Sequence, residues 1–122
     1  MNYLDVSAMA GMTLTKIDVV DAEMIFTADN GRTFKLYHDQ DCCEDVRIDD
    51  IAGELTDLIG TPLLQSEEVS SEPPVRETDD YVPESETWTF YKFATIKGYV
   101  TVRWYGTSNG YYSESVTFAE LT

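Results

Sequence analysis

One apolar stripe at helical spacing constrains this chain more than any other feature of its sequence. Between residues 48 and 59, apolar side chains recur at intervals of three and four residues, which is the period of an amphipathic helix. The members of the stripe are Ile48, Ile51, Ala52, Leu55, Leu58 and Ile59. Gly60 and Pro62 mark its end, since glycine adopts the left-handed conformation that follows a helix and proline cannot continue one. The sequence offers no second amphipathic helix, so we expect this one to lie on a sheet.

The rest of the chain has the patterns of β-strands. The predicted strands are 12–20, 24–28, 33–37, 87–96, 99–105 and 111–118, and 62–69 is a weaker candidate. Asp29–Arg32 predicts a hairpin turn of type I′, because Asn30 and Gly31 tolerate positive φ. Both faces of 88–96 are apolar, which indicates a central strand covered on both sides. We therefore predict an α+β fold, an antiparallel sheet of five or six strands with one helix packed on it.

Length and charge restrict the domain count and the partners. The 122 residues suit a single domain, 1–122. The net charge of −15 disfavours direct contact with nucleic acid and favours a protein partner with a basic surface. Much of this charge lies in residues 39–57 and 66–86. The second segment also contains Pro73, Pro74 and Pro83, so we interpret it as an acidic loop or linker.

The sequence gives no sign of export or of membrane insertion. No basic N-terminal region precedes an apolar run, and no apolar stretch is long enough to span a bilayer. The two cysteines are adjacent and provide no disulfide framework. We expect a cytoplasmic protein without membrane contact.

The residues after the predicted strand 33–37 form the densest group of potential ligands. They are His38, Gln40, Asp41, Cys42, Cys43 and Glu44. The His-x3-Cys-Cys spacing is weak as a zinc site, since adjacent thiolates rarely reach one tetrahedral ion, and the sequence leaves metal binding undecided. A cysteine nucleophile lacks any orienting or oxyanion group. We favour a loop-to-helix junction with the cysteines turned inward as small apolar side chains, with no catalytic residue and no cofactor.

A second concentration of candidate residues follows the strand 99–105. Aromatic, small polar and glycine residues at a hairpin tip suit recognition, although aromatic pairing across strands explains many of them. The candidates are Arg103, Trp104, Tyr105, Ser108, Asn109, Tyr111, Tyr112 and Ser113. Arg103 would hold an anionic ligand or pair with the acidic helix, and we favour the pair.

Two stretches carry a resemblance to a known group of proteins. They are HDQDCCEDVRIDDIAGELTDLIGTPLLQSEE and WTFYKFATIKGYVTVRWYGTSNGYYSESV. Together they resemble a family of small uncharacterised proteins from bacteriophages and bacteria, over roughly His38 to Phe118. The His-x-Gln-Asp-Cys-Cys-Glu and Trp-Tyr-Gly-x-Ser-Asn-Gly-Tyr-Tyr-Ser patterns are its distinctive parts. The resemblance implies an accessory protein of phage or mobile DNA and brings no activity with it.

The leading hypothesis is a non-catalytic phage-type accessory protein that inhibits a host protein, such as a defence component, by occupying a basic surface. The acidic face of the predicted helix would make the contact, through Asp49, Asp50, Glu54 and Asp57. An alternative is a module that sequesters a small molecule or metal between the 38–44 loop and the tyrosine-rich hairpin, which requires the two to meet. A cysteine enzyme is disfavoured. An exposed strand edge would allow a homodimer.

Overall fold

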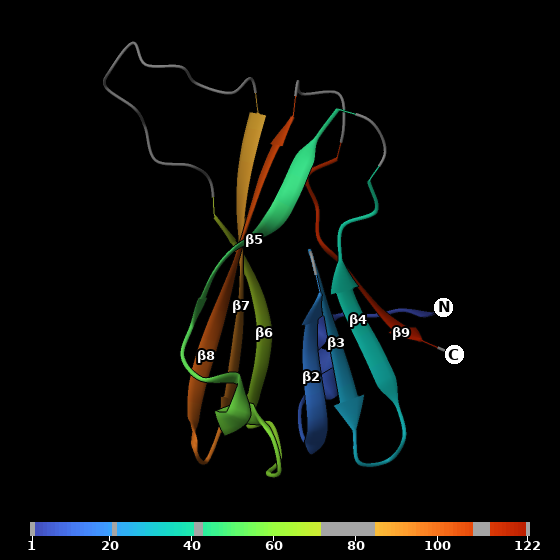
Figure 1. The fold of residues 1–122 in the computed structure, drawn as a ribbon, viewed down its shortest axis with the longest axis vertical. Coiled ribbons are helices and arrows are strands. Elements are labelled where there is room, and N and C mark those ends of the chain that lie inside the picture. Colours follow the sequence, from blue (N-terminus) through green and yellow to red (C-terminus); the bar gives the residue numbers. More distant parts are fainter. Residues whose placement is uncertain (1, 21, 41–42, 72–84, 109–112, 122) are drawn as a thin grey trace.

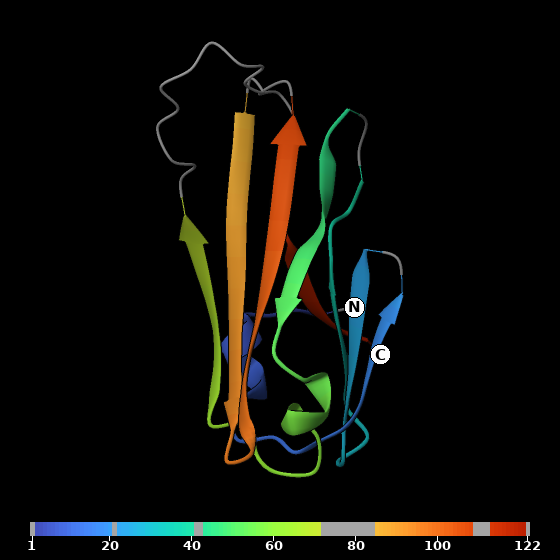
Figure 2. The same cartoon turned by 60° about the vertical axis from the view of Figure 1, so that its left-hand side comes forward.

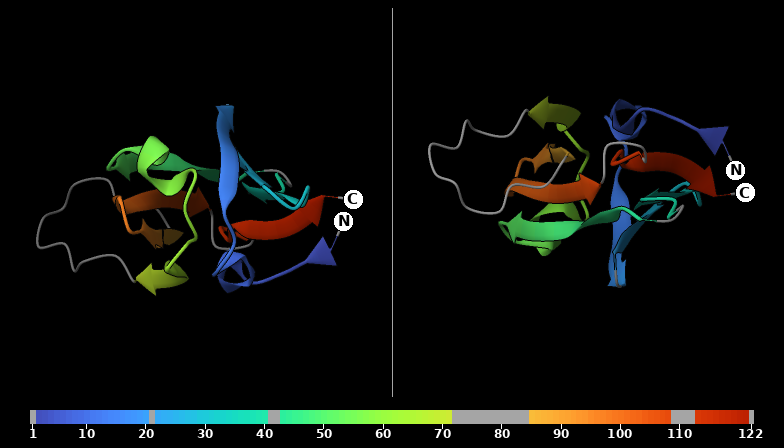
Figure 3. Two further views of the ribbon diagram at one scale, coloured as in Figure 1. Left: turned by 90° about the horizontal axis from the view of Figure 1, so that it is seen from below. Right: turned by 90° about the horizontal axis from the view of Figure 1, so that it is seen from above.

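The protein is built almost entirely of β-strands. The computed structural model describes residues 2–20, 22–40, 43–71, 85–108 and 113–121. Its strands form two antiparallel sheets that lie side by side in Figure 1. Viewed along the long axis, each sheet occupies its own half of the molecule (Figure 3).

The two sheets draw their strands from different parts of the chain. The five-stranded sheet has the order β1-β9-β4-β3-β2. Its strands are β1 (Asn2–Tyr3), β9 (Thr117–Leu121), β4 (Thr33–Tyr37), β3 (Glu23–Ala28) and β2 (Leu14–Val20). The four-stranded sheet has the order β5-β8-β7-β6. Its strands are β5 (Asp45–Ala52), β8 (Gly98–Ser108), β7 (Ser85–Thr95) and β6 (Gln65–Ser71). Two short 3-10 turns, η1 (Val6–Met9) and η2 (Leu55–Leu58), complete the described fold.

Alternating side chains build the core between the sheets. Successive residues of a strand point to opposite faces, and β3 accordingly buries Met24, Phe26 and Ala28 while the residues between them are partly exposed. The rings of Phe26 in β3 and Phe93 in β7 lie 5.6 Å apart, which places the inner faces of the two sheets in direct contact. One continuous apolar cluster therefore joins both sheets.

One end of the sandwich has a polar interior. The eleven-residue strands β7 and β8 extend well past β2, β3 and β4 (Figure 2). Over this extension the inner face of β7 changes from Phe93 and Tyr91 to Thr89 and Thr87. Thr87 and Thr89 face the connection that precedes β9 rather than a strand of the other sheet. The candidate site lies in this region.

The predicted helix over 48–59 is wrong, and with it the α+β class and the count of five or six strands. Residues 45–52 form β5, and the structure has no helix of seven or more residues among those it describes. A bulge explains the misleading spacing: Ile48 pairs with Trp104 and Asp50 with Arg103, so Asp49 is an extra residue. The apolar residues on the inner side are therefore two and then three apart, which imitates a helical interval. Leu55 and Leu58 belong to η2.

Other boundaries follow the sequence more closely. The hairpin between β3 and β4 forms at the predicted place. Gly31 N donates to Ala28 O, so Asp29 and Asn30 are the two central residues of the turn, and Gly31, the next residue, has a positive φ of +86°. The first residues of the predicted 66–86 loop lie in β6, and its last two lie in β7. Residues 72–84 lie outside the described residues. No helix in the described parts of the chain is long and apolar enough to cross a membrane.

Candidate functional site

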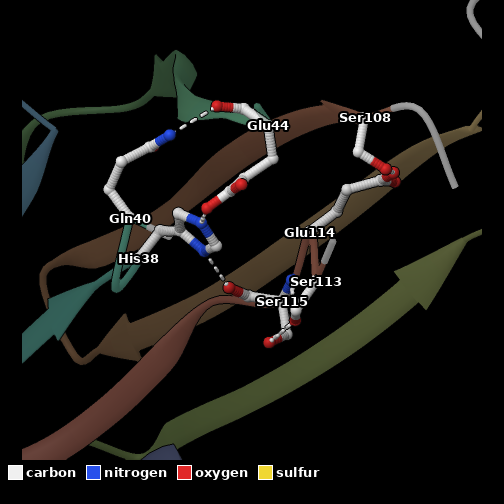
Figure 4. A network of polar contacts seen from close by, with 7 residues as sticks. All are labelled: His38, Gln40, Glu44, Ser108, Ser113, Glu114 and Ser115. Atoms are coloured by element: carbon white, nitrogen blue, oxygen red, sulfur yellow. Dashed lines mark hydrogen bonds and ion pairs between the residues drawn. The ribbon is translucent and has the colours of Figure 1, made fainter. Parts of the chain in front are cut away.

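His38 joins the first segment that the sequence singled out to residue 115, just after the second. It follows β4, and its Nδ1 lies 2.7 Å from the carbonyl oxygen of Ser115, in the segment that leads into β9. Its Nε2 lies 3.0 Å from Glu44 Oε1, just before β5 (Figure 4). The side chains of His38 and Glu44 are only 5% and 0% exposed. The imidazole therefore links the connection between β4 and β5, which carries the chain from one sheet to the other, to the segment just before β9.

The geometry of His38 fixes which ring nitrogen donates to Ser115. A carbonyl oxygen only accepts, so Nδ1 must carry a hydrogen. Gln40 braces the same turn, since its Nε2 donates to Glu44 O at 2.7 Å.

Glu114 is a second buried acid beside this pair. Its carboxylate accepts hydrogen bonds from Thr87 Oγ1 in β7 at 2.8 Å and from Ser108 Oγ in β8 at 2.5 Å. A Cβ at Gly106 would lie 2.9 Å from Glu114 Cβ, so β8 needs glycine where the 113–116 segment crosses it. Glu114 thereby holds this segment against the extended ends of β7 and β8.

A cavity of about 300 Å³ opens between this segment and the four-stranded sheet. Hydroxyl and carboxyl groups make up most of its wall. It is lined by Glu68, Ser70, Thr87, Thr89, Ser113, Glu114, Ser115 and Val116. Tyr91 donates to Glu68 Oε1 at 3.0 Å, and burial, followed by the negative charge of Glu68, raises the pKa of the Tyr91 hydroxyl well above its usual value. Tyr91 therefore remains a proton donor.

The predicted residues of the tyrosine-rich hairpin are dispersed. Trp104 is buried in the core, while Arg103 and Tyr105 lie on the outer face of the four-stranded sheet. Arg103 pairs with Asp49 at 2.5 Å, the pairing that the sequence favoured, although on a strand. Ser108 and Ser113 lie beside Glu114 and Ser115. Asn109, Tyr111 and Tyr112 lie outside the described residues.

The cysteine-containing segment differs from expectation. Cys43 is exposed and takes part in a disulfide, so it is neither an inward-facing thiol nor a thiolate nucleophile. Asp41 and Cys42 lie outside the described residues. No group of three or more histidine, cysteine or acidic residues in the described parts of the chain is arranged to hold a metal ion.

The four predicted acidic residues occupy an edge rather than a helix face. Asp49 and Asp50 stand at the β5 bulge on the outer side of the sheet, and Asp49 is engaged by Arg103. Glu54 precedes η2 and Asp57 lies within it. The acids remain near one another in the chain, but they form no continuous helical surface.

The outer face of the four-stranded sheet places two aromatic residues that were not among the sequence candidates, Trp88 and Phe90, beside Arg103 and Tyr105, which were. Trp88 and Tyr105 face each other across β7 and β8 with their ring centroids 4.4 Å apart. Arg103 lies over the Trp88 ring at 5.1 Å, and Phe90 occupies the neighbouring position beside Arg103. We call Trp88, Phe90, Arg103 and Tyr105 the outer aromatic face. The apolar character of both faces of 88–96 is the sequence signal for this face, although that pattern predicts cover on both sides. No described element covers this face.

Comparison with known proteins gives a family and no further relative. No curated protein and no solved structure matches the chain. A domain of unknown function, DUF7448, matches residues 7–118, which include the whole four-stranded sheet, most of the five-stranded sheet and the polar end of the sandwich. The chain therefore belongs to the DUF7448 family.

Proposed function

We propose that this chain is a non-catalytic accessory binding protein that occupies a basic surface of a partner protein through its outer aromatic face. The observation that carries the proposal is that no element among the described residues lies over this face, whose four residues are partly exposed. In a sandwich of antiparallel sheets the outer side is ordinarily polar, because it faces water. Here it presents the stacked Trp88 and Tyr105 rings with Phe90 beside them.

The surroundings of the outer aromatic face match an interface. Aromatic residues and arginine concentrate binding energy at interface centres because they contribute large contact areas at a small entropic cost. Acidic residues stand around them on the same side of the sheet, namely Asp45, Asp49, Asp50, Glu67 and Glu86. A hollow of about 310 Å³ next to Lys92, Tyr99 and Thr101 would accept a partner side chain.

Electrostatics select the kind of partner. The net charge is −15, and Lys16, Arg32, Lys35, Arg47 and Arg103 each already pair with a carboxylate of the chain. The excess negative charge would steer a basic surface toward the aromatic centre and accelerate association. The resemblance to phage proteins makes a bacterial host protein, encountered in the cytoplasm, the proposed target class.

The experiment compares capture of proteins from bacterial lysate by three tagged forms of the chain. These are the wild type, a Phe90→Ser variant of the outer aromatic face, and a Tyr3→Ser control on the other sheet, where Tyr3 is 70% exposed. We expect one host protein to bind wild type and control in equal amounts, to be lost with Phe90→Ser, and to dissociate at high salt. Far-UV circular dichroism would check that each form is folded. Retention of the partner by Phe90→Ser, or binding indifferent to salt, would contradict the proposal.

A further inference from the structure

The cavity at the polar end of the sandwich lies on the opposite side of the four-stranded sheet from the outer aromatic face, and its wall is unusual for an interior. The inner faces of packed sheets normally meet through apolar side chains. Here five hydroxyl residues and two acids line the space, with Val116 as the apolar residue. Thr89 and Glu114 are buried, whereas Glu68, Ser70, Ser113 and Ser115 are exposed to solvent. A wall of hydroxyl and carboxyl groups at such a solvent-open cavity favours a polar occupant.

The acids of this wall lack a cationic counterpart within the described structure. Glu114 is 8% exposed, and the contacts found for its carboxylate are hydroxyl groups, Thr87 and Ser108. Glu68 is held by the Tyr91 hydroxyl. None of the ion pairs between described residues includes Glu68 or Glu114. Both carboxylates are thus oriented by neutral donors, and their charge is left for another group.

The chemistry of the wall defines the ligand. Carboxylates repel anions and attract cations, and a buried carboxylate gains most from a cation that also forms hydrogen bonds. The hydroxyl groups of Ser70, Thr89 and Ser113 donate or accept according to need. A volume of about 300 Å³ is at the lower limit of small-molecule sites, which excludes a peptide or nucleotide of ordinary size.

We propose that this cavity binds a small organic cation, an amine that also carries hydroxyl groups, through Glu68 and Glu114. The ammonium group would lie between the two carboxylates, and the ligand hydroxyls would bond the serine and threonine side chains. The site is independent of the outer aromatic face, because inner and outer residues alternate along β6 and β7.

Two neighbouring residues of β6 provide a matched test. Glu68 lines the cavity, whereas Glu67 points to the opposite side of the sheet, where it accepts from Gln65. Glu68→Gln and Glu67→Gln make the same change in net charge. Glucosamine serves as the probe, and glucose is its neutral control of almost the same shape. Binding is measured by calorimetry and by amide chemical shifts in two-dimensional NMR.

We expect glucosamine to shift the amide signals of Thr87, Thr89 and residues 113–116, and to bind at least tenfold more tightly than glucose. Glu68→Gln should weaken binding about tenfold, the equivalent of 1.4 kcal/mol, and Glu67→Gln should leave it unchanged. Glu114→Gln provides a second, buried variant with the same expected direction. Equal weakening by Glu67→Gln and Glu68→Gln, or shifts scattered over the acidic surface, would show general attraction to the negative charge and overturn the proposal. Absence of shifts at these residues with up to 50-fold excess of glucosamine, on the order of tens of millimolar, would overturn it as well.

Discussion

His38 Nε2 lies 3.0 Å from Glu44 Oε1, and this contact closes the crossover that carries the chain from one sheet to the other. Both side chains are buried. Removal of Glu44 would leave His38 Nε2 without this partner, and an unsatisfied buried polar atom costs more than an ordinary hydrogen bond contributes. The pair therefore ties the end of β4 to the start of β5.

Glu44→Ala should lower the free energy of unfolding by about 3 kcal/mol, because it leaves the buried imidazole without its partner. Glu44→Gln should cost about 1 kcal/mol, since the side-chain amide can donate to Nε2 of a neutral His38. Urea denaturation at pH 7 would measure both. Equal losses for the two variants would show that the hydrogen bond at Nε2 is not what stabilises the crossover.

Alkaline pH should destabilise the protein through Tyr91. The pKa of this hydroxyl is raised in the folded state by burial and by Glu68, whereas in the unfolded chain it is near 10. The raised pKa of Tyr91 therefore contributes fully to the free energy of unfolding below pH 10. This contribution is lost as the pH rises above that value, because the unfolded chain releases the proton first. Denaturation curves between pH 8 and about 11 should show a smaller slope of stability against pH for Tyr91→Phe. An unchanged slope would contradict the assignment.

Acidic pH should act through Glu120 in β9. Arg32 Nε and Nη2 each donate to its carboxylate at 2.9 Å, and these hydrogen bonds lower the pKa of Glu120. The lowered pKa of Glu120 contributes to the free energy of unfolding above the pKa of an unfolded glutamate. This contribution is lost as the pH falls through the lowered pKa of the folded state. Glu120→Gln should reduce the dependence of stability on pH below about 4.5 and leave the alkaline behaviour unaffected. The measurement is a series of thermal melts between pH 2 and 7.

Gly106→Ala should disturb the polar end of the sandwich. The added methyl group would lie 2.9 Å from Glu114 Cβ and 3.1 Å from Val46 Cγ2, so the 113–116 segment would have to move. We expect a loss of about 1–3 kcal/mol in the free energy of unfolding. Thr107→Ala, the next residue, faces outward and should cost less than about 0.5 kcal/mol. If the two variants were equally stable, the close approach of Glu114 to β8 would be disproved.

Strand alternation made single hairpins predictable, but it did not reveal that the strands divide into two sheets, and the bulge in β5 concealed one strand. The hairpin β3–β4 and the pair β7–β8 follow from alternating residues and turn signals, which depend only on neighbours in sequence. Glu114 could not be selected in this way. A lone glutamate after a hairpin gives no local sign that Thr87, 27 residues away, will donate to it. The contact between His38 and Ser115 is likewise set by the packing of the sheets.

The same limitation explains why the sequence alone does not identify Trp88 and Phe90 as outward-facing residues. Trp88 and Phe90 alternate with Tyr91 and Phe93, so the sequence shows that both sides of β7 are apolar. It does not show which side meets the second sheet. That depends on the position of Trp104, which packs inward on β8 and pairs with Thr89.

The bulge in β5 gives a direct test of why the helix prediction failed. Because Asp49 is the extra residue, its deletion would restore strict alternation and keep Val46, Ile48 and Ile51 on the inner side. Deletion of Arg47 would instead move Ile48 to the outer side and turn Asp49 inward. We expect the Asp49 deletion to lower the free energy of unfolding by about 1 kcal/mol and the Arg47 deletion by several times as much, enough to unfold a marginal domain.

Urea denaturation and two-dimensional NMR of the two deletion variants would measure these effects. In a helix, both deletions would rotate the following residues by the same angle and harm the protein alike. Similar losses for the two variants would therefore contradict the strand with its bulge. If the variant lacking Asp49 folds and the variant lacking Arg47 does not, the three-residue interval between Ile48 and Ile51 is produced by the bulge.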